Sequence, residues 1–206
     1  MGLASLAPLI LLTAAQAVVS PAASTQRALS WEQARSLAQK LEKLDERERL
    51  GVTRGQPAPP ALVASEGEIN SYLNLSLGSK LPAGLADVQV LLDRDRIAAR
   101  AVVDLEKVRA RTTDSGRWSP LSYLTGRVPL EVKGRYRHGQ EGFGSLEVEE
   151  IWLASFPIPV SLLEQVVSSA APAGKDARRF DIQAPFRLPY AAKRLRVQKG
   201  QARLEF

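Results

Sequence analysis

Several polar residues have types and spacings that could support catalysis, and each also has a plain structural interpretation. His138 is the single histidine and stands beside Gly139 in a predicted turn. A general base needs an orienting carboxylate and a nucleophile, and no such set surrounds His138, so we expect a turn residue. Glu147 and Glu149 alternate on the solvent face of a predicted strand, an ordinary place for carboxylates, with Glu150 beside them. A catalytic carboxylate pair is therefore a minor alternative.

The remaining chemical motifs are incomplete. Asp93 and Asp95 resemble the start of a calcium loop but lack its glycine and distal glutamate. The segment 142–144 lacks the flanks and the third glycine of a dinucleotide-binding loop. The absence of cysteine excludes thiol catalysis, disulfides and zinc–thiolate sites. We expect a protein that is not an enzyme and uses neither cofactor nor metal; a hydrolase with an unrecognised site is the minor alternative.

The more informative pattern is a series of segments in which apolar and polar residues alternate. Such alternation is typical of half-buried strands. It predicts hairpins over 85–92 with 96–105 and over 128–137 with 143–153, and extended segments after residue 180 with a turn at Lys199-Gly200. The alternation slips at Glu149-Glu150, where we expect a β-bulge or a bend.

Helical patterns flank these strands. Ser30 to Leu50 reads as an amphipathic helix with a thin apolar stripe, followed by a proline-rich linker over 55–60. Capping boxes at Ser65–Glu68 and Ser161–Glu164 each predict a helix start. The predicted fold class is α+β: a curved antiparallel β-sheet, a meander of hairpins, wrapped around or covered by one or two helices, with an additional N-terminal helix.

The N-terminus resembles an export signal. Residues 3–15 are apolar or small, and Ala15-Gln16-Ala17 provides a small-x-small cleavage pattern, although no lysine or arginine precedes Arg27. We therefore expect a signal peptide over 1–23, a helix and linker over 24–60, a domain over 61–206, and a periplasmic or secreted protein. An uncleaved anchor, for which the apolar run is short, and a misassigned start codon are the alternatives.

The chain is basic, with a formal charge of +6. Its arginines are scattered among acidic residues and are not interleaved with the aromatic residues that nucleic-acid binding would use, so no nucleic-acid partner is expected. A solvated basic surface is the simple interpretation, and attraction to anionic lipid headgroups is the functional one.

The apolar strand face has two interpretations. It can be the protein's own core, or it can leave an apolar groove for an acyl chain. Small residues at strand positions favour the groove: Ala98, Ala99, Ala101, Gly134 and Gly144. Basic residues near strand ends are candidates for binding a phosphate headgroup: Arg135, Arg137, Lys193, Arg194 and Arg196.

The segment Ser65–Leu73 resembles an x-E-x-E-(I/L)-N-x-Y-L opening found in small exported bacterial domains. The segments 84–92, 128–134 and 156–159 are also similar to theirs. From residue 65 to the C-terminus the chain thus resembles the TULIP-like (tubular lipid-binding) envelope proteins, including the LmeA-like group. This resemblance implies an elongated sheet wrapped around a helix, with lipid in the groove. By position the groove would be lined by Ile69, Tyr72, Leu73, Val90, Leu92, Ala101, Val103, Leu130, Val132, Leu146, Val148, Leu163, Val166 and Val167.

The predicted function is extracytoplasmic binding or carriage of lipid, specifically phospholipid, at a membrane surface and without catalysis. The alternative is a structural or adaptor protein of the cell envelope. In that case the helix over Trp31–Leu44 docks a protein partner, and the protein's own helices fill the sheet face.

Overall fold

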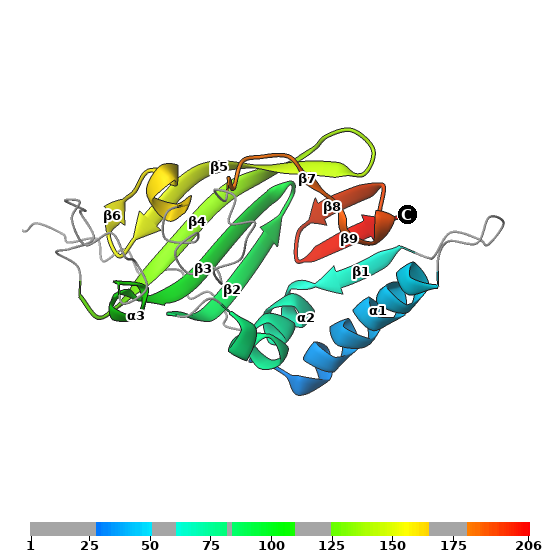
Figure 1. The fold of residues 1–206 in the computed structure, drawn as a ribbon, viewed down its shortest axis with the longest axis horizontal. Helices are drawn as coiled ribbons and strands as arrows, with labels where there is room; N and C mark the ends of the chain where they lie inside the picture. Colours follow the sequence, from blue (N-terminus) through cyan, green and yellow to red (C-terminus); the bar gives the residue numbers. More distant parts are fainter. Residues whose placement is uncertain (1–27, 51–60, 82–83, 110–124, 165–180) are drawn as a thin grey trace, which may run out of the picture.

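The computed structural model describes residues 28–50, 61–81, 84–109, 125–164 and 181–206, and within them the fold is α+β with two antiparallel sheets (Figure 1). The larger sheet is open and has the order β2-β3-β4-β5-β6, with β7 also pairing with β5. The smaller sheet has the order β1-β9-β8. The strands are β1 (Leu62–Ser65), β2 (Leu85–Asp93), β3 (Arg96–Asp104), β4 (Arg127–His138), β5 (Phe143–Leu153), β6 (Phe156–Pro157), β7 (Phe186–Arg187), β8 (Arg194–Gln198) and β9 (Gln201–Glu205).

The helices lie at the ends and edges of the sheets. They are α1 (Trp31–Arg49), α2 (Glu66–Ser71), its continuations η1 (Tyr72–Ser76, a π-helix) and η2 (Gly78–Lys80), α3 (Leu105–Arg109) and η4 (Pro189–Ala191). Both predicted hairpins are present, and so is the capping box at Ser65.

The helix start predicted at Ser161 is confirmed to within one residue, because helical residues begin at 160, and the Glu164 carboxylate accepts a hydrogen bond from the Ile182 amide. Of the extended segments expected after residue 180, the first was wrong, because residues 181–184 form a turn in which the Asp181 carboxylate accepts from two main-chain amides. The later ones are confirmed as β7, β8 and β9, with the expected turn at Lys199-Gly200. In both places a carboxylate hydrogen-bonds to the main chain in a way that the local pattern did not predict.

The larger sheet has one charged and one apolar face. On the outer face, ion pairs join neighbouring strands: Arg100–Glu131 at 3.1 Å, Lys133–Glu150 at 2.9 Å, Arg135–Glu149 at 3.3 Å and Arg137–Glu147 at 2.9 Å. Pairs this exposed each contribute little stability, but they identify the face turned to solvent. The pairing shifts register between Lys133 and Gly134, opposite Glu149, which confirms the predicted bulge.

The free edge of β2 is covered by side chains of α2 and η1. Asn70 accepts from the Val90 amide at 2.6 Å and donates to the Val90 carbonyl at 2.9 Å. Asn74 makes the same two bonds with Val88, at 3.0 and 2.6 Å. Glu66 accepts from the Leu92 amide at 2.7 Å, and the Leu92 carbonyl accepts from the amide of Gly200. Four helical residues advance about 6 Å and two strand residues about 6.8 Å, so the two spacings nearly match.

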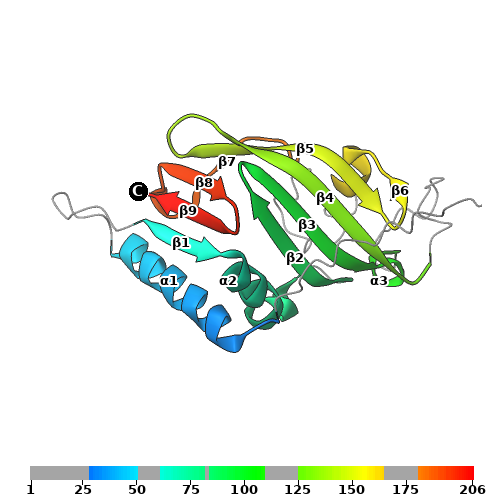
Figure 2. The same ribbon diagram turned by 180° about the vertical axis from the view of Figure 1, so that it is seen from behind.

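Helix α1 packs against α2 and η1, as Figure 2 shows from behind. Ala34, Leu37 and Leu44 are its buried residues. At the contact, Glu68 accepts hydrogen bonds from Lys40 and Ser36, both at 2.6 Å. Burial works to raise the pKa of Glu68, but these bonds and one from the Ser65 main chain outweigh it and lower the pKa from 4.5 to about 2.

Replacing Asn70 should weaken the whole fold. Asn70→Ala leaves the amide and carbonyl of Val90 without partners in a part-buried position. We expect the free energy of unfolding to fall by about 2 kcal/mol, measured by urea denaturation. As the control, Gln39→Ala removes a side-chain amide from the exposed side of α1 and should change the free energy of unfolding by less than about 0.5 kcal/mol. Equal effects of the two variants would contradict the proposed role of Asn70.

Glu68 should make stability depend on pH. Its pKa is depressed in the folded protein, so its contribution is complete above pH 4.5 and is lost as the pH falls towards about 2. The shift corresponds to about 3 kcal/mol. Glu68→Gln should lower stability at neutral pH and flatten its decline over this range in chemical denaturation series. Glu42→Gln, at an exposed position of α1, should leave the decline unchanged.

Candidate functional site

The inner face of the larger sheet is apolar along its length, and some of its buried side chains form two separate clusters, whereas Ile151 and Leu153, buried opposite Val132 and Leu130, belong to neither. At one end, Leu92, Tyr136 and Val197 form a core that Ile69 of α2 also contacts. At the other end, Val103 and Leu105 form a second core. On β3, β4 and β5, five described apolar side chains of this face belong to neither cluster and are only half-buried: Ala99, Ala101, Val132, Leu146 and Val148.

The residues predicted to line a groove are thus divided in three. Those in the two end clusters or packed against them are Ile69, Val90, Leu92, Val103 and Leu130. Those that are half-buried and belong to neither cluster are Ala101, Val132, Leu146 and Val148. Among the helical candidates, Tyr72 and Leu73 are half-buried and Leu163 is buried, whereas Val166 and Val167 lie outside the described residues. We refer to Ala99, Ala101, Val132, Leu146 and Val148 as the inner strip.

The small residues proposed to leave room for a ligand do not share one role. A Cβ atom on Gly144 would lie 2.6 Å from the Tyr136 ring, and one on Gly134 would lie 2.8 Å from the Glu147 carbonyl oxygen. These glycines therefore accommodate the protein's own atoms. Ala98 pairs with Leu91 on the charged outer face. Of these five small residues, only Ala99 and Ala101 belong to the inner strip.

Burial of Tyr136 has a chemical consequence. Its ring belongs to the first core cluster, and its hydroxyl has no hydrogen bond of good geometry among the described residues. Burial raises the pKa of Tyr136, and the main-chain amide of Leu195 only partly opposes this. The phenol therefore stays neutral and serves as a packing group.

A second surface feature is an open cleft of about 630 Å³ where the two sheets meet. Its lining includes Arg94, Arg96, Arg135, Arg137, Arg194 and Arg196, together with His138. Four of the five predicted headgroup residues thus come together; the fifth, Lys193, lies next to the cleft and pairs with Glu141 at 3.9 Å. We call these six arginines and their surroundings the arginine cleft.

The arginine cleft and the inner strip are on opposite faces. Tyr136 points into the inner core, so its neighbours Arg135 and Arg137 point outward, where they pair with Glu149 and Glu147. Arg96 is directly opposite Arg135 in the register and shares that outer face. An acyl chain on the inner strip and a phosphate in the arginine cleft would therefore lie on opposite faces of the larger sheet.

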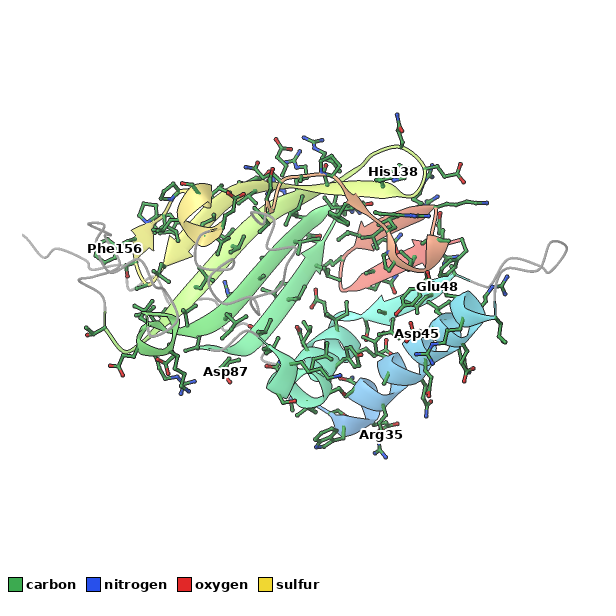
Figure 3. The ribbon with its side chains drawn as sticks, in the orientation of Figure 1. Arg35, Asp45, Glu48, Asp87, His138 and Phe156 are labelled. Atoms are coloured by element: carbon green, nitrogen blue, oxygen red, sulfur yellow. The ribbon has the colours of Figure 1, made fainter. Side chains whose placement is uncertain are left out.

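His138 lies exposed at the end of the β4–β5 hairpin, beside the smaller sheet, while Phe156 lies at the far end of the larger sheet (Figure 3). In the part of the chain that the structure describes, no group of three or more histidine, cysteine or acidic residues is arranged to hold a metal ion. The features of the described surface are thus an apolar strip and a basic cleft.

Comparisons with protein-family models, with curated proteins and with solved structures find no match to this chain. The resemblance to TULIP-like proteins therefore stays a hypothesis based on the sequence motifs alone.

The tight contact at Gly144 provides a test of whether its small size serves packing. Gly144→Ala places a methyl group against the Tyr136 ring, and we expect a loss of about 1–3 kcal/mol in the free energy of unfolding. Gly78→Ala, where a Cβ would meet no atom within 4 Å, is the matched control and should be neutral or slightly stabilising. Thermal unfolding of the two variants gives the comparison; an unchanged melting temperature for Gly144→Ala would show that this site has spare room.

Proposed function

We propose that this protein binds lipid, with an acyl chain lying along the inner strip, and that it carries out no chemistry on it. The observation that supports this most directly is the half-buried inner strip, whose apolar side chains belong to neither of the two clusters. An apolar surface with few polar groups is one requirement of a site that accepts an acyl chain. The resemblance of the Ser65–Leu73 motif to TULIP-like proteins favours the same function, specifically phospholipid binding.

The proposed location is outside the cytoplasm, and it rests on the signal-like residues 1–23. None of the helices in the described ranges is both long and apolar enough to cross a bilayer. We propose a periplasmic or secreted protein that meets lipid at a membrane surface.

The decisive experiment is lipid analysis of the natively purified protein. The protein beginning at Ser24 is extracted with organic solvent, and the extract is analysed by mass spectrometry beside an unrelated secreted protein. We expect lipid in near-stoichiometric amounts. An extract without lipid, also after incubation with phospholipid vesicles, would contradict the proposal.

Two substitutions on one strand locate the lipid. Ala101→Trp fills the inner strip and should reduce the retained lipid at least about tenfold while the domain stays folded. Ala98→Trp, on the outer face of the same strand, should retain lipid as the unmodified protein does. If Ala101→Trp unfolds the domain and Ala98→Trp does not, the inner strip is packed core and the proposal fails.

The adaptor function remains the alternative, and one observation bears on it. The apolar stripe of α1 is already buried against α2, and its C-terminal half faces η4, where burial and then the charge of Asp45 raise the pKa of Tyr190. The exposed apolar residues that α1 leaves for a partner lie at its two ends, where Leu29 and Trp31 are 47% and 59% exposed and Leu50 is 84% exposed. A lipid-free protein that loses a partner on Trp31→Ala would favour this alternative.

A further inference from the structure

We infer that the arginine cleft is a docking site for anionic phospholipid headgroups at a membrane surface, separate from the lipid proposed for the inner strip. The inference does not depend on lipid binding there, because the two surfaces are on opposite faces of the larger sheet. It rests on the positions, pairing and surroundings of the cleft arginines.

The main chain holds the cleft in place. Asp95, in the β2–β3 turn, has φ of 54°, donates to the Val197 carbonyl at 3.2 Å and accepts from the Tyr136 amide at 2.7 Å. One residue thus joins the turn to β4 of the larger sheet and to β8 of the smaller one. Arg94 and Arg96 flank it, so their backbone is fixed beside the arginines of β4 and β8. Such preorganisation lowers the entropic cost of binding an anion.

Positive charge in the cleft is only partly neutralised. Arg135, Arg137 and Arg196 pair with glutamates at 3.3, 2.9 and 2.9 Å. Among the described residues, no carboxylate lies within 4 Å of the side-chain nitrogens of the other three, Arg94, Arg96 and Arg194, and all three are exposed.

Two arginine pairs face one another across strands, and they are compensated differently. In the smaller sheet Arg196 is directly opposite Arg203, and Glu205 bridges both at 2.9 and 3.5 Å. In the larger sheet Arg96 is directly opposite Arg135 on one side and Asp93 on the other; Glu149 pairs with Arg135, and among the described residues no carboxylate, that of Asp93 included, is within 4 Å of the Arg96 guanidinium. Like charges in this position repel, and a bound phosphate next to Arg96 would relieve the repulsion.

The surroundings favour a membrane over a soluble phosphate. Phe143 is 42% exposed and is a diagonal neighbour of Arg137 on the outer face, because Arg137 pairs with Ser145. Arg187 is directly opposite Phe143 on β7, and Lys193 adds charge beside the hairpin turn. An exposed aromatic ring among several cations is typical of surfaces that lie on anionic bilayers.

The test is binding to vesicles of phosphatidylcholine with and without phosphatidylglycerol, measured by co-sedimentation of the full mature chain. We expect binding that needs phosphatidylglycerol and weakens at high salt. Arg96→Gln with Arg194→Gln should reduce the affinity about 30-fold, since each arginine near such a surface contributes about fivefold. The matched control, Lys43→Gln with Arg49→Gln, removes the same charge from exposed positions of α1 and should change the affinity for these vesicles less than about twofold. Equal losses would show attraction to net charge alone and overturn the inference.

Two further measurements complete the test. Arg94→Gln, at the exposed tip of the turn, should reduce affinity about fivefold and serves if the double variant misfolds. Inorganic phosphate at constant ionic strength should not displace vesicles; displacement would assign the cleft to soluble phosphate and overturn membrane docking. Lipid retained on native purification should be unaffected by the cleft variants, so the outcome here is distinguishable from that for the inner strip.

Discussion

The constraint on which the described structure depends is the need to satisfy the free edge of β2. An exposed strand edge offers unpaired amides and carbonyls that attract other strands. Here the side chains of Glu66, Asn70 and Asn74 hydrogen-bond to main-chain groups of alternate β2 residues, and the amide of Gly200 donates to the Leu92 carbonyl. The same bonds hold α2 at the sheet edge, which places Ile69 in the core beneath it.

This constraint changes the meaning of the motif around residues 65–73. Glu68 closes the capping box and pairs with Lys40 of α1, while Glu66 and Asn70 pair with β2. Its polar residues therefore determine how helix, sheet and N-terminal helix fit together. A motif that looks like part of a binding site is, in this chain, chiefly an organiser of the fold.

The two surfaces that carry the proposals arise from one property of the larger sheet. Alternation along each strand, interrupted by the bulge at Glu149, sends ion-paired residues outward and apolar residues inward. Helix α2 and the smaller sheet bury one end of the inner face, and α3 follows the strand at the other. The inner strip consists of the half-buried apolar residues of β3, β4 and β5 that belong to neither cluster. The arginine cleft exists because the smaller sheet brings its own outward arginines against those of β3 and β4.

The sequence by itself determined the local elements. Period-two alternation located both hairpins, the phase slip at Glu149 located the bulge, and Ser30 and Ser65 located two helix starts, because each signal acts between residues near in sequence. It did not locate β1, whose four residues are strand only because β9 pairs with them.

Only the tertiary structure decided which distant residues meet. The alternating pattern selected Arg135 and Arg196 separately. The main-chain hydrogen bonds of Asp95 to β4 and β8 bring them to one cleft. Nothing in the local pattern distinguished Gly144, which makes room for Tyr136, from Ala101, which faces the inner strip. Hydrogen bonds and packing between segments far apart in the chain decide these matters, and periodicity reports only which side of its own strand a residue occupies.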